Sequence, residues 1–339
     1  MRPLPFLYPS VLAGSLRSYL GKLVDPSFPP ELVERLRSVA VHGPLPATDE
    51  SLYFPTPNDA VFSTKLDRLY QLAPLRVLSE GCGTDLPVDA GGLVGFKVEP
   101  EENFKPGRPP AFWSNARMTD WLLQRESRGG GQMDSIPPDV RWHVQVKDET
   151  YAAMDQRLFQ TSGLAFPEGV HLAARFQPVP GITFEPGYSP LGGERRLAHW
   201  AQGGDALWKC PTELVAALAK VPRLRLVLAT PGLFAKGFIP SWLGEQGAIP
   251  GTKIKVALKG VCVDRWRAIS GYSLDRSRFG RKPVRRLAPA GAVYFLERLD
   301  GDQEPFPVES VWLKPVSDLS EDIHRSAADG FGLGLWGTW

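Results

Sequence analysis

Residues 9–20 read Pro-Ser-Val-Leu-Ala-Gly-Ser-Leu-Arg-Ser-Tyr-Leu, and the argument about the fold starts from them. One face of this stretch has the apolar spacing of a helix, with side chains at Leu12, Leu16, Tyr19 and Leu20. A helix is therefore predicted over 10–21, with Ser10 as its N-cap. A second stripe joins the small residues Ser10, Ala13 and Gly14 to Arg17, so it permits close approach, either by a sheet or by a ligand.

Downstream of this helix the pattern becomes extended. Proline-rich residues 43–63 are incompatible with regular helix, and strands are predicted over 67–78 and 93–98. A long insertion over about 99–137 contains a short helix at 115–126, capped by Ser114, and a flexible Gly129–Gly131 loop. Apolar and polar residues then alternate over 141–146 and 170–176, which predicts two strands that each bury one face.

After about residue 205 the pattern restarts. A helix is predicted over 211–220 with Thr212 as N-cap, and strands over 224–229, 253–263, 291–297 and 335–339. Strands interspersed with helices in two halves indicate an α+β protein made of two sandwiches. The predicted domains are residues 1–205 and 206–339.

The composition bounds the class of protein. The chain has 339 residues, of which 43% are hydrophobic and 22% charged, which excludes disorder and coiled coil as the main architecture. The sequence has no apolar run long enough to span a membrane. Cys82, Cys210 and Cys262 form no Cys-x-x-Cys pair, which excludes a disulfide framework and predicts a reducing cytoplasm.

Charge is concentrated in the last third of the chain. Residues 265–286 hold eight basic residues and one acidic residue, interleaved with Trp266, Tyr272 and Phe279. Arginine with aromatic rings suits single-stranded nucleic acid, because guanidinium binds phosphate and rings stack on bases. Residues 300–322 are acidic in turn. Two alternatives to nucleic-acid binding are therefore open: the basic segment is a solvated loop that faces an acidic one, or it is a patch that binds another protein.

Sequence motifs for catalysis are lacking. The glycines at 332, 334 and 337 match a dinucleotide fingerprint in spacing, but no helix follows them, so a tight turn or close backbone approach is the better interpretation. The five histidines show no metal-ligand spacing, and no P-loop or nucleophile elbow is present. We therefore expect no catalytic residue, no metal and no cofactor.

Six segments, taken in order, resemble a known family. They are Pro9–Arg17, Leu52–Pro57, Asp155–Thr161, the Gly-Gly-Glu-Arg-Arg motif at 192–196, Pro289–Phe295 and Gly330–Gly332. Together they resemble the RAMP superfamily of CRISPR proteins, and in particular its family of third subunits of Cmr (type III-B) effector complexes.

This resemblance implies two ferredoxin-like RAMP domains with long loop insertions. It also implies a non-catalytic, cytoplasmic, prokaryotic protein of antiviral defence that caps the 5′ repeat-derived tag of the crRNA. Its partners would be the crRNA, the large polymerase–cyclase subunit and a backbone RAMP subunit, with target RNA met only indirectly. The RNA-binding residues mapped in this way are Ser10, Gly14, Arg17, Gly192, Gly193, Arg195, Arg196, Arg276, Arg278, Arg281, Lys282, Arg285, Arg286, Gly332 and Gly334.

Three alternatives stay open. The chain could be a RAMP endoribonuclease that processes crRNA, with His42 in its proline-rich segment as the general base. It could be the 5′-tag subunit of another type III subtype. The basic segment 265–286 could instead bind an acidic protein neighbour, and Arg195 and Arg196 could pair with Glu194 or Asp205.

Overall fold

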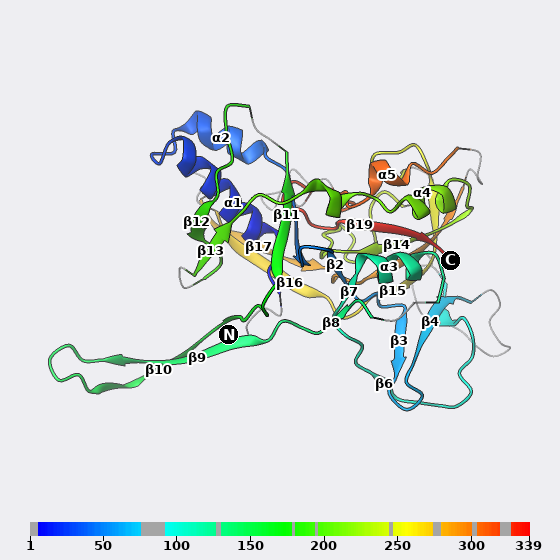
Figure 1. The fold of residues 1–339 in the computed structure, drawn as a ribbon, viewed down its shortest axis with the longest axis horizontal. Helices are drawn as coiled ribbons and strands as arrows, with labels where there is room; N and C mark the ends of the chain where they lie inside the picture. The colour runs from blue at the N-terminus through cyan, green and yellow to red at the C-terminus, as the bar shows by residue number, and fades with distance from the viewer. Residues whose placement is uncertain are drawn as a thin grey trace.

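The structure is a computed structural model, and its strands greatly outnumber its helices (Figure 1). It describes residues 6–75, 92–126, 130–177, 180–193, 196–243, 247–273, 279–299, 304–318 and 327–339. This confirms the mixed class of helices and strands predicted from the sequence. No helix in these ranges is both long and apolar enough to cross a membrane.

A four-stranded antiparallel sheet forms the centre of the C-terminal half. Its order is β15 (Val256–Cys262), β18 (Val293–Arg298), β14 (Arg223–Leu228) and β19 (Gly334–Thr338). All four predicted strands are therefore confirmed. Two short helices lie nearby, α4 (Thr212–Leu218) and α5 (Val308–Val311), and the first begins with Pro211 as N-cap instead of Thr212.

The first helix, α1 (Pro9–Val24), packs with α2 (Pro30–Ser38) against a strand pair. The pair is β1 (Val41–Ala47) and β11 (His171–Phe176), which run antiparallel. Leu12, Leu16 and Leu20 of the predicted apolar stripe are buried in one hydrophobic cluster with α2 and β1, and Tyr19 is buried as well. The predicted N-cap was wrong, because Pro9 occupies the first turn and Tyr8 is the N-cap, as suits a proline whose missing N–H has no helical partner.

Small sheets make up the rest of the N-terminal half. One contains β2 (Tyr53–Pro55), β7 (Phe112–Ser114) and β8 (Gln132–Met133). Another contains β5 (Val94–Phe96), β4 (Arg68–Pro74), β3 (Ala60–Ser63) and β6 (Pro106–Gly107). These sheets and the β1–β11 pair stay separate, so two ferredoxin-like domains stay a prediction.

The helix predicted at 115–126 is α3 (Asn115–Leu122), and its Ser114 cap is confirmed by a hydrogen bond that the Arg117 amide donates to the Ser114 hydroxyl. Trp113, Met118 and Leu122 are buried in the same hydrophobic cluster as Leu226 and Trp336 of the central sheet. One core thus includes side chains from both predicted domains. The division at residue 205 stays a prediction.

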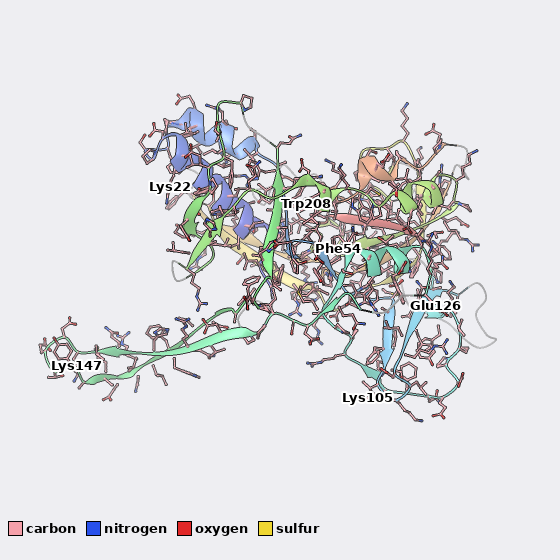
Figure 2. All side chains as sticks on the ribbon, viewed as in Figure 1. Lys22, Phe54, Lys105, Glu126, Lys147 and Trp208 are labelled. Carbon is pink, nitrogen blue, oxygen red and sulfur yellow. The ribbon has the colours of Figure 1, made fainter. Side chains whose placement is uncertain are left out.

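A long hairpin, β9 (Pro138–Val146) and β10 (Ala153–Leu164), projects from the body (Figures 1 and 2). The alternation over 141–146 predicts a buried face, and this was wrong: Trp142 is 65% exposed, and Val144 and Val146 are exposed with it. The alternating pattern formed a strand, but within the described ranges no layer packs on either of its faces.

Two further hairpins lie close to α1. One is β12 (Gly187–Pro190) with β13 (Leu197–Trp200), followed by a single 3-10 turn at Asp205–Trp208. The other is β16 (Arg267–Ser273) with β17 (Gly280–Leu287), so the basic segment predicted from the sequence is a two-stranded ribbon. The hydroxyl of Tyr8, at the start of α1, donates a hydrogen bond to the Ala268 carbonyl at 3.1 Å and ties this ribbon to the helix.

Candidate nucleic-acid interface

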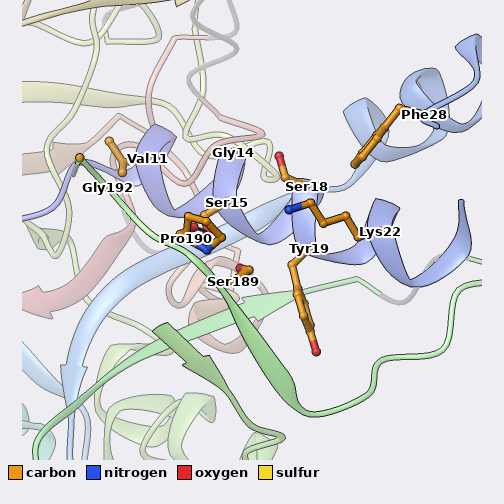
Figure 3. Close-up of a pocket in the computed structure, with 11 residues that line it drawn as sticks. Val11, Gly14, Ser15, Ser18, Tyr19, Lys22, Phe28, Ser189, Pro190 and Gly192 are labelled. Carbon is orange, nitrogen blue, oxygen red and sulfur yellow. Dashed lines mark hydrogen bonds between the residues drawn. The ribbon is translucent and has the colours of Figure 1, made fainter. Parts of the chain in front are cut away.

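An open groove of about 650 Å³ runs along the outer face of α1 (Figure 3). One side of the groove is formed by residues of α1, namely Val11, Gly14, Ser15, Ser18 and Lys22. The other side is formed by Phe28, the end of β12 and the loop that follows β12. Lys22 is the charged side chain among the described residues that line it. Much of the lining is apolar, from side chains such as Val11 and Phe28, and hydroxyl groups, glycine backbone and the Lys22 cation lie among them. The groove therefore offers one cation and several hydrogen-bonding groups to an anionic chain.

The wall of the groove is held to α1 by side-chain contacts. The Ser15 hydroxyl donates a hydrogen bond to the Pro190 carbonyl at 2.6 Å, and the Tyr19 hydroxyl donates one to the Glu185 carbonyl at 2.5 Å. The Tyr19 ring also stacks on Trp200, with ring centroids 5.9 Å apart. These contacts fix the β12–β13 hairpin beside the helix, so the groove is a built feature of the fold.

Glycines from two distant parts of the sequence meet at this groove. Gly14 lines the helix side, and Gly192 and Gly193 line the loop side. A Cβ added at any of the three would meet nothing within 4 Å, so each glycine faces open space. Ser10 is half-buried and is not among the residues lining the groove.

Arg17 turns away from the groove and into the protein. Its guanidinium pairs with Asp329 at 2.5 Å and donates hydrogen bonds to the carbonyls of Val39 and Ala328. The Arg17 side chain is 14% exposed and that of Asp329 is 7% exposed. With its donors used inside the chain, Arg17 joins α1 to the C-terminal tail, and we assign it no contact with RNA.

Arg196, at the end of the Gly-Gly loop, lies against the base of the β9–β10 hairpin. Its guanidinium is 3.4 Å from a carboxylate oxygen of Asp139, which also pairs with Arg141. The Arg141 hydrogen bond is the main reason why the pKa of Asp139 lies below its usual range. Arg196 thus connects the groove loop to the projecting hairpin, while Arg195 and Glu194 lie outside the described residues.

The β16–β17 ribbon carries exposed cations and rings. Arg281, Arg285 and Arg286 are exposed and Lys282 is half-buried, while Arg276 and Arg278 lie outside the described residues. The Arg286 guanidinium lies 4.8 Å from the centre of the Trp266 ring, and Tyr272 packs edge-on against Phe279. Guanidinium and aromatic faces side by side form a surface that can bind phosphate and stack on bases.

The glycines at the end of the chain lie in the interior, not on the surface. A Cβ at Gly332 would lie 2.4 Å from the Ser317 hydroxyl, and one at Gly334 would lie 2.9 Å from the Leu226 side chain. Both residues are buried. The predicted close backbone approach is present, but the protein itself is what approaches, so we assign Gly332 and Gly334 to packing.

The β9–β10 hairpin is a feature that the sequence argument missed. Beyond Trp142 it exposes Leu158 and Phe159, and the Phe159 ring stacks on His143 with centroids 5.2 Å apart. Near its tip, Tyr151 is 83% exposed. The sequence did contain a signal for a hairpin. The predicted strand at 141–146 is followed by a polar turn and then by a second stretch with apolar residues that could pair with it.

Among the described residues no three His, Cys, Asp or Glu side chains come together as a metal site. Burial raises the pKa of the free thiols of Cys210 and Cys262 to about 12 each. His42, the candidate general base, is half-buried in β1, and burial lowers its pKa to about 4 with help from the charges of Arg175 and Lys314. A base with so low a pKa is poorly matched to proton abstraction at neutral pH.

Three comparisons with known proteins extend this picture. A family model described as CRISPR-associated protein (Cas_Cmr3) matches residues 3–339, whereas no curated protein matches the chain. Two solved chains share the overall trace weakly, both from cryo-EM structures of the type III-B Cmr-beta bound to cognate target RNA. They have TM-scores of 0.46 and 0.45 and identities of 13% and 14%, and the matches cover 88% and 85% of this chain and 77% of each of theirs.

A third solved chain, from a crystal structure of the Csm3–Csm4 subcomplex of the type III-A interference complex, has a TM-score of 0.36 and 9% identity. That match covers 88% of this chain and 92% of the other. The family model identifies the class: this is a CRISPR-associated protein. The family match extends over nearly the whole chain, and the chain belongs to the Cmr3 family.

Proposed function

We propose that this chain is a non-catalytic, crRNA-binding subunit of a type III-B CRISPR effector complex. In this proposal it caps the 5′ repeat-derived tag of the crRNA and bridges the large polymerase–cyclase subunit to the backbone subunits. The observation that carries the proposal is the convergence of Gly14, Gly192 and Gly193 on one open groove. A groove walled by glycine backbone lets a sugar–phosphate chain approach closely.

The surroundings of the groove favour RNA over a small molecule. The β16–β17 ribbon adjoins the start of α1 through Tyr8, and Arg196 ties the groove loop to the β9–β10 hairpin. The ribbon offers cations for phosphate, and both hairpins expose rings on which unpaired bases can stack. Such an extended surface suits a strand of several nucleotides.

The test is to co-express the chain with its genomic neighbours, purify the assembly and sequence the 5′ ends of the bound RNA. Uniform ends that carry repeat sequence, together with a polymerase-like large subunit, are expected. Replacing Gly193 by Trp fills the groove and should remove the RNA, while Gly203→Trp, at another glycine with open space around it, should leave the RNA bound. Ragged or absent RNA in the wild-type assembly contradicts the proposal.

Two rival functions have tests of their own. An endoribonuclease would cut repeat RNA without added metal, and His42→Ala would stop the cleavage. A ribbon that binds only protein would lose a subunit in the variant Arg281→Glu with Arg285→Glu, while the affinity for RNA stayed at the wild-type value. Either result would replace the corresponding part of the proposal.

A further inference from the structure

A cluster of three basic side chains lies away from the groove, with two members on the β1–β11 strand pair and one on the segment after α5. His42 on β1 is the register partner of Arg175 on β11. The Arg175 guanidinium lies 5.4 Å from the centre of the ring of Trp208, which is buried and so holds the arginine in place. The third member, Lys314, follows α5 and is exposed.

The C-terminal tail brings Lys314 to this strand pair. Gly330 presses on β1, where an added Cβ would lie 3.2 Å from the Gly43 nitrogen. Three residues later Leu333 pairs with Pro315, and the Gly334 amide donates a hydrogen bond to the Lys314 carbonyl at 3.0 Å. The tail is therefore bordered by β1 on one side and by Lys314 on the other.

The cluster and α1 lie on opposite faces of the strand pair. Val41 is buried in the α1 cluster, and a Cβ at Gly43 would lie 3.5 Å from Leu12 of α1, so His42 between them points to the other face. On β11, Ala174 and Phe176 pack on the same α1 cluster, which turns Arg175 away from it. The three basic groups are thus separate from the groove.

Arg175 and Lys314 carry like charges that repel each other, and among the described residues no carboxylate forms an ion pair with either of them. Burial is the main cause that lowers the pKa of His42 and the pKa of Lys314. The charges of Arg175 and Lys314 lower the pKa of His42 further, and the charge of Arg175 lowers the pKa of Lys314 further. The Nδ1 atom of His42 is buried without a hydrogen-bond partner. The half-buried Arg175 guanidinium has no counter-charge among the described residues, which is costly, and an anion beside it and Lys314 would remove that cost.

We propose that Arg175 and Lys314, with His42 beside them, bind one phosphodiester group of the bound RNA, an inference that rests on the proposed function. A guanidinium and an ammonium group suit phosphate, since each donates charge-assisted hydrogen bonds. His42, neutral at physiological pH, adds a donor without adding charge. The RNA strand would then extend past the groove onto the opposite face of the β1–β11 pair.

The experiment measures the affinity of the full-length chain for an RNA that begins with repeat sequence, over a series of salt concentrations. The variants are Lys314→Gln alone and with Arg175→Gln, and Lys253→Gln is the matched control, since it is an exposed lysine beside the sheet edge opposite β19. The double variant should bind about tenfold more weakly. Its slope of log affinity against log salt should fall by about 0.7.

A second arm locates the contact on the RNA. Single linkages are replaced in turn by neutral methylphosphonate. One linkage should weaken binding to the wild-type chain and to Lys253→Gln, but not to Lys314→Gln. Because Lys314 is exposed, this variant keeps the fold intact even if loss of Arg175 loosens the packing of Trp208.

The outcomes separate the two proposals. If the wild-type chain binds the RNA and Lys314→Gln binds it with the same affinity and salt slope, the phosphate site is wrong and the proposed function stands. If the wild-type chain does not bind the RNA, both are wrong. If the wild-type chain cuts the RNA and His42→Ala does not, the cluster is a nuclease site, which also overturns the proposal.

Discussion

Two glycine motifs that look alike in sequence have opposite environments in the structure. Gly192 and Gly193 border an open groove, and an added Cβ at either would meet nothing within 4 Å. Gly330 at the end of the chain has a φ of 88°, and its added Cβ would lie 2.5 Å from the Val41 carbonyl oxygen. The first pair leaves room for a ligand, and the last segment leaves room only for the chain itself.

This difference teaches that a glycine motif reports close approach and not the identity of what approaches. The two regions should respond differently to substitution. Changes in the packed tail should lower the free energy of unfolding. Changes at Gly14 and Gly193, which lack the left-handed φ of Gly192, should alter RNA binding with little or no loss of stability. Each prediction below tests that separation.

The largest effect is expected from Gly330→Ala. Alanine at a φ of 88° is strained, and its methyl would overlap the carbonyl oxygens of Val41 and Gly43, which belong to rigid β1 backbone. Strain of about 1–3 kcal/mol and overpacking of similar size should together lower the free energy of unfolding by about 4 kcal/mol. Chemical denaturation measures this loss, and Gly203→Ala, in open space, is the control.

If Gly330→Ala unfolds at the denaturant concentration of the wild-type chain, the tail is not packed on β1 as described. The proposed difference between packed and open glycines would then not hold for Gly330.

The next largest effect is expected from Arg17→Met. Methionine keeps most of the volume but removes the ion pair between Arg17 and Asp329, and removing one member of a buried pair costs about 3 kcal/mol. Thermal unfolding should show the loss. Affinity for RNA, measured well below the melting temperature, should match that of the wild-type chain, and a large fall in affinity would return Arg17 to the RNA-binding residues.

Arg17 also shows how far the sequence could go. Helical spacing predicted that Arg17 shares a stripe of α1 with Gly14, but Gly14 lines the groove and Arg17 points into the protein. No local pattern indicates an ion pair with Asp329, which lies 312 residues away in the sequence. The buried pair between Asp59 and Arg225 in the main core was out of reach for the same reason. Strands and helices depend on local periodicity, whereas partners of charged side chains depend on tertiary contacts.

The exposed hairpin makes the complementary point. Alternating residues at 141–146 correctly predicted a strand. Alternation does not show whether the apolar face of a strand is buried in the core or exposed on the surface, and here it is exposed. Residues 113–122 were expected in an insertion, yet Trp113, Met118 and Leu122 are buried in the main core. Periodicity determined the elements well, but the position of each element relative to the core required the structure.

A smaller effect, of at most about 3 kcal/mol, is expected on acidification. His42 has a pKa of about 4 in the folded chain and near 6.5 when unfolded, so the unfolded chain binds more protons between these values. The stabilisation is fully present above pH 6.5 and is lost as the pH falls towards 4. His42→Gln should flatten this part of the curve of unfolding free energy against pH, and an unchanged curve would show that the imidazole is not buried beside the tail.

The smallest effect on stability is expected at the groove, from Gly14→Ala. Gly14 is an exposed helical glycine, so alanine should raise the free energy of unfolding by about 0.5–1 kcal/mol. The same methyl group enters the groove and should weaken RNA binding several-fold, because the sugar–phosphate chain could no longer reach the helix backbone. A variant that is more stable yet binds less well would separate the open glycines from the packed ones, since no damage to the fold could account for the lost affinity. If instead the more stable variant binds RNA as the wild-type chain does, the groove is not the path of the RNA, and the β16–β17 ribbon becomes the first surface to test.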